Sequence, residues 1–233
     1  MLELGGCAPF IVLPDADVEQ AVQTLLVAKY RNNGQSCIAA NQIFVAREVA
    51  GEFVDAFVAA TERLVVGDPL DATSDLGPLA PAGDPARMGA LVDDAVAAGA
   101  RVAGTRSAVP SDGHWFAPTV LVDVPASARA ARDEVFGPVA AVSTFDDLDD
   151  AIDRHLATGY GLAGYVCGSD AEAARAVSRR LRAGIVGINT GTPNYPGAPF
   201  GGLGLSGTGY EGGPQGLEAF QAWRTTAVVG PVS

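Results

Sequence analysis

The residues best suited to chemistry are a cysteine and a glutamate near the start of the chain. Cys37 follows Asn32-Asn33-Gly34, a run typical of a helix end, where a thiol can leave the packed core. Backbone N–H groups at a helix end lower the pKa of a thiol from its ordinary value of about 8.5. The resulting thiolate is a strong nucleophile toward a carbonyl carbon. Glu3 lies 34 residues before Cys37, and its carboxylate can act as a general base.

Each of these residues also has a structural interpretation. A lone cysteine is most often a buried packing residue, and a glutamate near the start of a chain is usually solvated. The presence of both favours the catalytic interpretation. We therefore predict that the sulfur of Cys37 and the carboxylate of Glu3 converge on the same small carbonyl compound.

The two motifs together resemble the aldehyde dehydrogenase superfamily, in which Glu-Leu-Gly-Gly is followed by Gly-Gln-x-Cys at this spacing. Other strings that carry the resemblance are Asp-Leu-Gly-Pro-Leu (75–79), Ala-Pro-Thr-Val-Leu (117–121), Glu-Val-Phe-Gly-Pro-Val (134–139), Tyr-Gly-Leu-Ala (160–163), Gly-Ile-Asn (187–189) and Pro-Phe-Gly-Gly (199–202). The segment from Lys29 to Cys37 resembles the succinate-semialdehyde branch of this superfamily. Each string alone is weak, but their order and spacing along nearly the whole chain are specific.

The resemblance implies NAD- or NADP-dependent oxidation of an aldehyde to its acid. Cys37 would attack the aldehyde to form a thiohemiacetal, hydride would leave to the nicotinamide, and Glu3 would activate the water that hydrolyses the resulting thioester. The backbone N–H of Cys37 is a candidate donor to the developing oxyanion. The resemblance also implies that Glu134 accepts hydrogen bonds from the cofactor ribose and that Phe136 packs beside the nicotinamide.

Recognition of the substrate is expected to involve Arg31, six residues before Cys37. In the succinate-semialdehyde branch, an arginine at this place binds the distal carboxylate of the substrate. The alternative is an exposed cation at a helix end. That branch commonly has serine in the loop before Pro-Phe-Gly-Gly, whereas Asn194 and Tyr195 stand here as the substrate-side residues.

The surrounding sequence alternates helices with short apolar strands, which predicts an α/β fold: a three-layer parallel sheet with helices on both faces. Helices are expected after Asp17, over residues 53–64, from Asp84, and after the capping pairs Asp146/Asp149 and Ser169/Glu172. Strands are expected at residues 10–13, 42–46, 119–122, 139–145, 162–166 and 185–188.

The Gly/Pro-rich segment 191–216 is too long for a simple connection, and such loops usually line a site. Within it, residues 202–207 match G-x-G-x-x-G. We reject this match as a phosphate-binding fingerprint, because it follows a proline-rich loop and no helix is expected to open there. The tail from Leu217 to Val229 is predicted to form a short helix and a final strand. The resemblance implies that this strand packs against another subunit of a homo-oligomer.

Composition excludes several classes of protein. The net charge of −12 and a pI near 4.4 argue against nucleic acid as a partner. The sequence has no apolar run of about 18 residues, so we expect no membrane span. Three cysteines without scaffold spacing indicate a reducing compartment, which we interpret as the cytoplasm. Cys7 and Cys167 are expected to be packing residues, His114 and His155 surface residues, and no metal ligand is assigned.

Members of the superfamily are about twice as long as this chain. We therefore interpret residues 1–233 as the catalytic domain, with the amino-terminal cofactor-binding domain absent. Turnover would then need that half to be supplied separately. Glu3 is then expected to be poorly ordered near a chain terminus. Three hypotheses remain open: an aldehyde dehydrogenase acting with its other half, a non-catalytic oligomerising remnant, and a cofactor-independent thiol esterase that uses Cys37 and Glu3.

Overall fold

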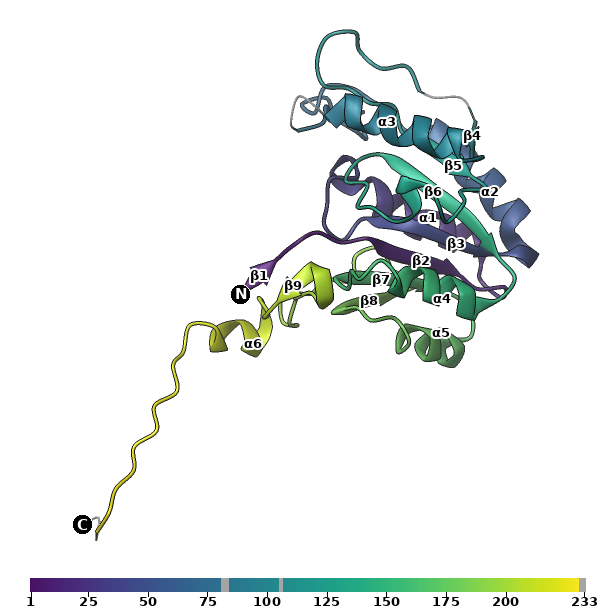
Figure 1. The fold of residues 1–233 in the computed structure, drawn as a ribbon. Coiled ribbons are helices and arrows are strands. Elements are labelled where there is room, and N and C mark those ends of the chain that lie inside the picture. The colour runs from purple at the N-terminus through teal and green to yellow at the C-terminus, as the bar shows by residue number, and fades with distance from the viewer. Residues whose placement is uncertain (81–83, 105–106, 231–233) are drawn as a thin grey trace.

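A sheet with the strand order β4-β5-β6-β3-β2-β7-β8 forms the centre of the molecule (Figure 1). The computed structural model describes residues 1–80, 84–104 and 107–230. The strands are β2 (Ala8–Val12), β3 (Ala40–Ala46), β4 (Arg101–Ala103), β5 (Thr119–Val122), β6 (Val139–Phe145), β7 (Ala163–Cys167) and β8 (Ile185–Ile188). All neighbouring pairs are parallel except β4 with β5. The predicted parallel sheet is therefore correct, apart from the antiparallel edge strand β4, which the sequence analysis missed.

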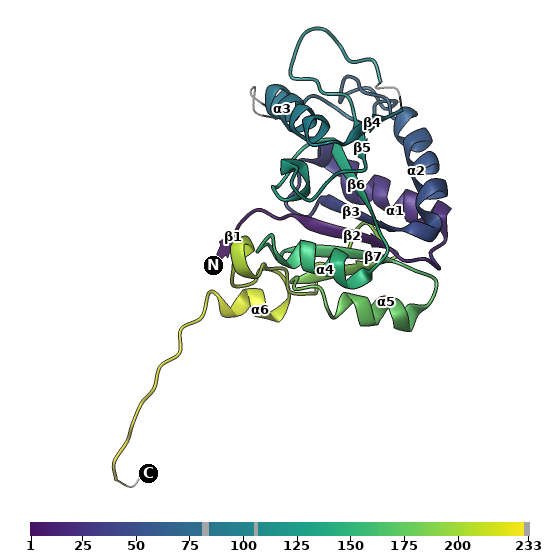
Figure 2. The same cartoon turned by 45° about the vertical axis from the view of Figure 1, so that its right-hand side comes forward.

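Helices cover both faces of this sheet, as predicted (Figure 2). They are α1 (Val18–Tyr30), α2 (Arg47–Glu62), α3 (Asp84–Ala97), α4 (Leu148–Leu156), α5 (Ala171–Ser178) and the short α6 (Gly213–Glu218). Side chains of α1 and α2 pack with Phe10 and Val12 on one face, whereas α4 and α5 pack with Ile11 on the other. Helix α3 covers Leu121 and Val139. This division follows from the period of two in a strand, which sends successive side chains to opposite faces.

Helix starts follow the capping chemistry, with two corrections. Asp17 caps α1 as predicted and accepts a hydrogen bond from the Gln20 N–H. The cap of α4 is Asp147 and not Asp146, which instead forms an ion pair with Arg47. The cap of α5 is Asp170 and not Ser169. Each observed cap lies one residue after the predicted one, and its carboxylate accepts from the first-turn N–H groups.

Two histidines were predicted to lie on the surface, and one prediction is wrong. His114 is exposed, but His155 is only 1% exposed. Its Nδ1 lies 3.2 Å from Gln42 Oε1, on the α4-covered face of the sheet. Burial lowers the pKa of His155 to about 4, so its ring is neutral. Cys7 and Cys167 are buried and unpaired, as expected of packing residues.

A second, two-stranded sheet involves the start of the chain. Strand β1 (Leu2–Glu3) pairs antiparallel with β9 (Gly207–Thr208), placing Glu3 opposite Gly207. The expectation that Glu3 is poorly ordered is therefore wrong. The formal G-x-G-x-x-G match ends in this pairing, after a 3₁₀ turn at Gly204–Ser206. Its rejection as the opening of a phosphate-binding helix is confirmed.

The carboxy-terminal tail leaves the body of the molecule after α6 (Figure 1). The predicted short helix is present, but residues 219–230 form no strand within the described chain. Trp223 is 100% exposed and Phe220 is 91% exposed. A strand requires a partner for its backbone groups, and none lies beside this tail among the described residues. Every helix in the described ranges is also too short or too polar to cross a bilayer.

Candidate active site

The side chains predicted to carry the chemistry lie together at the end of the sheet where its parallel strands begin. Glu3 lies in the segment before β2, Cys37 lies in the turn before β3, and Glu134 lies in the loop before β6. These three strands are neighbours and run parallel, so the segments that precede them are adjacent. Ligands of open α/β sheets usually bind at the carboxyl ends of the strands, and this site lies at the opposite edge.

Cys37 lies between two pockets. The first, of about 550 Å³, contains both predicted catalytic residues and both predicted cofactor residues. It is lined by Glu3, Leu4, Gly5, Asn32, Gln35, Ser36, Cys37, Glu134 and Phe136. We call it the cofactor-side pocket.

The second pocket has a volume of about 310 Å³ and lies on the other side of the cysteine. It is lined by Ser36, Cys37, Ile38, Asn194, Tyr195, Pro196, Ala198, Phe200, Glu211 and Gly212. The structure therefore brings Asn194 and Tyr195 beside Cys37, as predicted for the long loop. We call this the loop-side pocket.

The thiol of Cys37 is half-buried, and its pKa differs from the expected one. Burial, followed by the charge of the Glu3 carboxylate and its side-chain hydrogen bond, raises the pKa of Cys37 to about 11. The backbone N–H of Cys37 acts in the opposite direction, as expected, but its effect is smaller. The prediction of a lowered pKa is therefore wrong. The thiol is protonated at neutral pH, and Glu3 is the carboxylate in contact with it.

Glu3 owes its place to the β1–β9 pairing. The Leu4 N–H donates to the Ser206 carbonyl at 3.1 Å, which continues the pairing beyond β1. The Ser206 hydroxyl is completely buried and accepts from the Gly161 N–H at 3.0 Å. A Cβ on Gly207, whose φ is +113°, would collide with the Leu2 carbonyl oxygen. The glycine-rich segment thus allows the backbone contact that positions Glu3.

Glu134 is fixed against the segment that follows Glu3. The Gly6 N–H donates to Glu134 Oε1 at 3.0 Å, and a Cβ on Gly5 would collide with Glu134 Oε2. Burial raises the pKa of Glu134 above its usual range, while the Gly6 hydrogen bond and the charges of Arg87 and Lys29 oppose this shift. One carboxylate oxygen is thus held by the protein, and the group lines the cofactor-side pocket.

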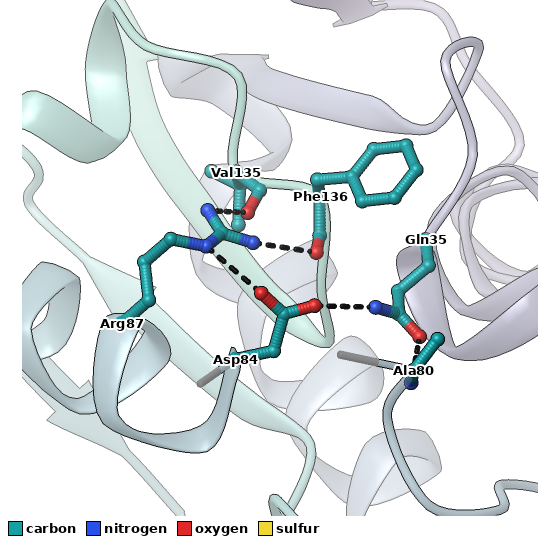
Figure 3. A network of polar contacts seen from close by, with 6 residues as sticks. All are labelled: Gln35, Ala80, Asp84, Arg87, Val135 and Phe136. Carbon is teal, nitrogen blue, oxygen red and sulfur yellow. Dashed lines mark hydrogen bonds and ion pairs between the residues drawn. The ribbon is translucent and has the colours of Figure 1, made fainter. Parts of the chain in front are cut away.

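A polar network joins the cysteine turn to the loop of Glu134 and Phe136 (Figure 3). Gln35 donates to Asp84 Oδ2 at 2.6 Å and accepts from the Ala80 N–H at 2.9 Å. Asp84 forms an ion pair with Arg87 at 3.2 Å. The Arg87 guanidinium donates to the carbonyl oxygens of Val135 and Phe136 at 2.8 and 3.0 Å. Helix α3 therefore sets the distance between the two loops.

Phe136 has a conformation that needs such support. Its φ is +47°, in the left-handed region that bulky residues rarely adopt. The Arg87 contact with its carbonyl holds this backbone, and the ring lines the cofactor-side pocket. A strained residue held at a pocket is typical of functional sites.

Arg31 is exposed at the end of α1. Among the described residues it lines neither pocket, and no carboxylate pairs with it. Its charge acts on the hydroxyl of Tyr165, which donates to the Ile38 carbonyl at 2.6 Å. Arg31 is therefore an exposed cation without an ion-pair partner in the described chain, and its charge reaches Tyr165, which contacts Ile38 of the loop-side pocket.

Several residues of the site were missed by the sequence analysis. Gln35, Asp84 and Arg87 form the connecting network, and Phe200 and Glu211 line the loop-side pocket. Reciprocal backbone hydrogen bonds of 2.7 Å join Phe200 to Glu211. Gln35 belongs to the Gly-Gln-x-Cys motif and Phe200 to the Pro-Phe-Gly-Gly string, and these were the available signals. The others are brought in from helices and loops distant in sequence.

The residues of the cofactor-side pocket fit a dinucleotide. A carboxylate with one oxygen held by Gly6 can accept hydroxyl donors with the other, and an aromatic ring offers a face for stacking. Within the described ranges, no group of three histidine, cysteine, aspartate or glutamate side chains could hold a metal ion.

Comparison with known proteins places this geometry in a family. The model of the aldehyde dehydrogenase family matches residues 1–226. A putative 4-(hydroxymethyl)benzenesulfonate dehydrogenase of Comamonas testosteroni is 47% identical over 94% of this chain and 46% of its own length. The NADP-dependent succinate-semialdehyde dehydrogenase of Escherichia coli is 42% identical over 94% of this chain and 45% of its own length.

Solved structures agree with this assignment. A succinate-semialdehyde dehydrogenase from Burkholderia pseudomallei superposes with a TM-score of 0.89 at 38% identity, over 94% of this chain and 45% of that one. The chain thus spans about half the length of the relatives that it matches. The sequence strings, the fold and these similarities lead to one conclusion: the chain belongs to the aldehyde dehydrogenase family.

Proposed function

We propose that residues 1–233 are the catalytic domain of an NAD(P)-dependent aldehyde dehydrogenase, with succinate semialdehyde as the expected substrate. The observation that carries this proposal is the position of Cys37 between two pockets, with the Glu3 carboxylate against its thiol. One pocket has residues that fit a dinucleotide, and the other is formed by the long loop. A nucleophile between two compartments can meet a carbonyl from one side and a cofactor from the other.

The side chains divide the chemistry as follows. Glu3 accepts the thiol proton, and the Cys37 thiolate then adds to the aldehyde carbon to give a thiohemiacetal. NAD(P)⁺, when bound, supplies the hydride acceptor. Glu134 holds ribose hydroxyls and Phe136 contacts the nicotinamide. After Glu3 has released its proton, it deprotonates the water that hydrolyses the Cys37 thioester.

A distal anion on the substrate is supported by Arg31 and by the relatives. The relatives are named for a benzenesulfonate, for glutarate semialdehyde and for succinate semialdehyde, each of which carries an acidic group away from the reacting carbon. Arg31 supplies a cation without an ion-pair partner in the described chain, and its charge reaches Tyr165, which contacts Ile38 of the loop-side pocket. Because the chain is otherwise acidic, a local arginine is needed to attract an anion.

A cofactor-independent esterase is the second candidate. The contact between Cys37 and Glu3 lies wholly within this chain and needs no second domain. A thiol with an adjacent carboxylate base can hydrolyse activated esters.

One experiment separates the candidates. The chain is incubated with NAD⁺ or NADP⁺ and succinate semialdehyde, alone and with the amino-terminal half of the Escherichia coli relative supplied in trans. We expect reduced cofactor to appear, measured by its absorbance. No reduced cofactor in either mixture, with p-nitrophenyl ester hydrolysis that Cys37→Ala abolishes, would favour the esterase. Absence of product in both assays would favour a non-catalytic remnant.

The Glu3–Cys37 contact predicts the pH dependence of alkylation. The rate of iodoacetamide reaction at Cys37, followed by peptide mass spectrometry, should rise with a midpoint near 11. At pH 8 only about one thiol in a thousand is then ionised. Glu3→Gln should lower the midpoint, because it removes a negative charge beside the thiolate. Glu19→Gln, on the exposed side of α1, is the matched control. An unchanged midpoint in Glu3→Gln would remove Glu3 from the site.

Arg31→Ala should raise KM for succinate semialdehyde by about fivefold, because it removes roughly 1 kcal/mol of attraction between charges that are not in direct contact. KM for butanal, which has the same chain length and no charge, should change little. Steady-state kinetics with both aldehydes measure the difference. Equal effects on the two substrates would exclude Arg31 from recognition.

The exposed tail supports a homo-oligomer, in which residues 219–230 pair with another copy of the chain. Exposed Trp223 and Phe220 would be covered by that pairing. We expect sedimentation to give a mass above that of one chain and Trp223→Arg to reduce it. A monomer at micromolar concentration would contradict this proposal.

A further inference from the structure

The buried amine behind the cofactor-side pocket has no assigned role. Lys29 is the only lysine in the sequence, and the other 14 of the 15 Lys and Arg residues are arginine. It lies in the last turn of α1 and is completely buried. An amine removed from water loses its hydration, so a lysine at such a position requires polar partners.

Its partners form a line that ends at Glu134. Lys29 Nζ donates to Asn41 Oδ1 at 3.4 Å, and Asn41 Nδ2 donates to the Gly6 carbonyl at 3.1 Å. The Gly6 N–H in turn donates to Glu134 Oε1 at 3.0 Å. Three hydrogen bonds therefore connect α1, through β3 and the segment before β2, to the cofactor-side carboxylate.

Lys29 and Glu134 are also coupled electrostatically. In the described chain no carboxylate forms an ion pair with Lys29. The titratable groups that act on it are the Cys7 thiol and the Glu134 carboxyl. Burial lowers the pKa of Lys29 to about 7 and raises the pKa of Cys7 to about 12. Cys7 has the larger effect on the pKa of Lys29, but it is a neutral thiol at pH 7, so Glu134 is the carboxyl that acts on Lys29. Arg87 lowers and Glu3 raises the pKa of Glu134, and Lys29 adds a smaller effect that lowers it.

We propose that Lys29 is a positioning residue of the cofactor-side pocket, which orients Glu134 through Asn41 and Gly6 and favours its ionised form. An ionised carboxylate accepts hydrogen bonds on both oxygens, whereas a protonated one loses acceptor capacity. An arginine would remain charged at every pH and is too large and planar to be an equivalent donor here. The role of Lys29 in the pocket rests on the proposed cofactor role of Glu134. The coupling between Lys29 and Glu134 does not depend on that role.

The single lysine makes the link measurable. In protein labelled with ¹³C-lysine, one ε-carbon signal reports Lys29, and its titration requires neither cofactor nor substrate. We expect a midpoint near 7, against about 10.4 for an exposed lysine. Glu134→Gln should lower this midpoint, because the negative charge of Glu134 stabilises the protonated amine and the substitution removes it. Asp133→Asn, which removes the neighbouring exposed carboxylate, should leave it unchanged.

The converse measurement uses Lys29→Met, a substitution of similar length without charge. The Glu134 carboxyl, followed through ¹³C-glutamate, should titrate at higher pH in this variant. Because coupling is reciprocal, the two shifts should be equal in size. If Lys29→Met does not fold, the wild-type and Glu134→Gln titrations still decide. A lysine midpoint near 10.4, or one that Glu134→Gln does not move, would overturn the proposal. Either outcome leaves the test of aldehyde oxidation unaffected.

Discussion

The parallel adjacency of β6, β3 and β2 is the constraint on which the site depends. Each of these strands is preceded by a segment that carries one chemical group: Glu134, Cys37 and Glu3 respectively. Parallel strands start at the same edge of a sheet, so three positions separated by up to 131 residues share one pocket. A change in strand order would separate them even if every helix and strand still formed.

Close approach at that edge depends on small residues and on a buried polar network. Gly5 lets Glu134 lie against the backbone after Glu3, and Gly6 lets the Cys37 carbonyl approach the same segment. A Cβ on Gly34 would collide with the Gly137 carbonyl oxygen. The Gln35–Asp84–Arg87 network then fixes the cysteine turn relative to Phe136. Buried networks of this kind are stable only when each member is satisfied, which makes the loops stiff.

Electrostatics in the site are set by burial more than by helix ends. Burial is the largest cause of the raised pKa of Cys37 and of the raised pKa of Glu134, and it also lowers the pKa of Lys29. The protons of the resting site are therefore held on sulfur, and chemistry depends on a neighbouring carboxylate to remove them. A helix end gives a thiol only a small preference for the charged form when the same thiol is half-buried.

The sequence by itself determined the class of fold, the approximate positions of the helices and of six strands of the large sheet, and the family, because periodicity and motif spacing are local properties. The strand predicted in the tail does not form within the described residues. The sequence also named Glu3, Cys37, Glu134, Phe136, Asn194 and Tyr195, each of which lines one of the two pockets, but it assigned no role to the network residues Asp84 and Arg87 or to the pocket residues Phe200 and Glu211. Only the tertiary structure decided which edge of the sheet holds the site, the burial of His155 and Lys29, and the direction of the Cys37 pKa shift. These depend on strand order and on desolvation, which arise from contacts between distant segments. Only the structure shows that Arg31 is exposed and lines neither pocket, because spacing along the chain does not fix the distance between a side chain and a pocket.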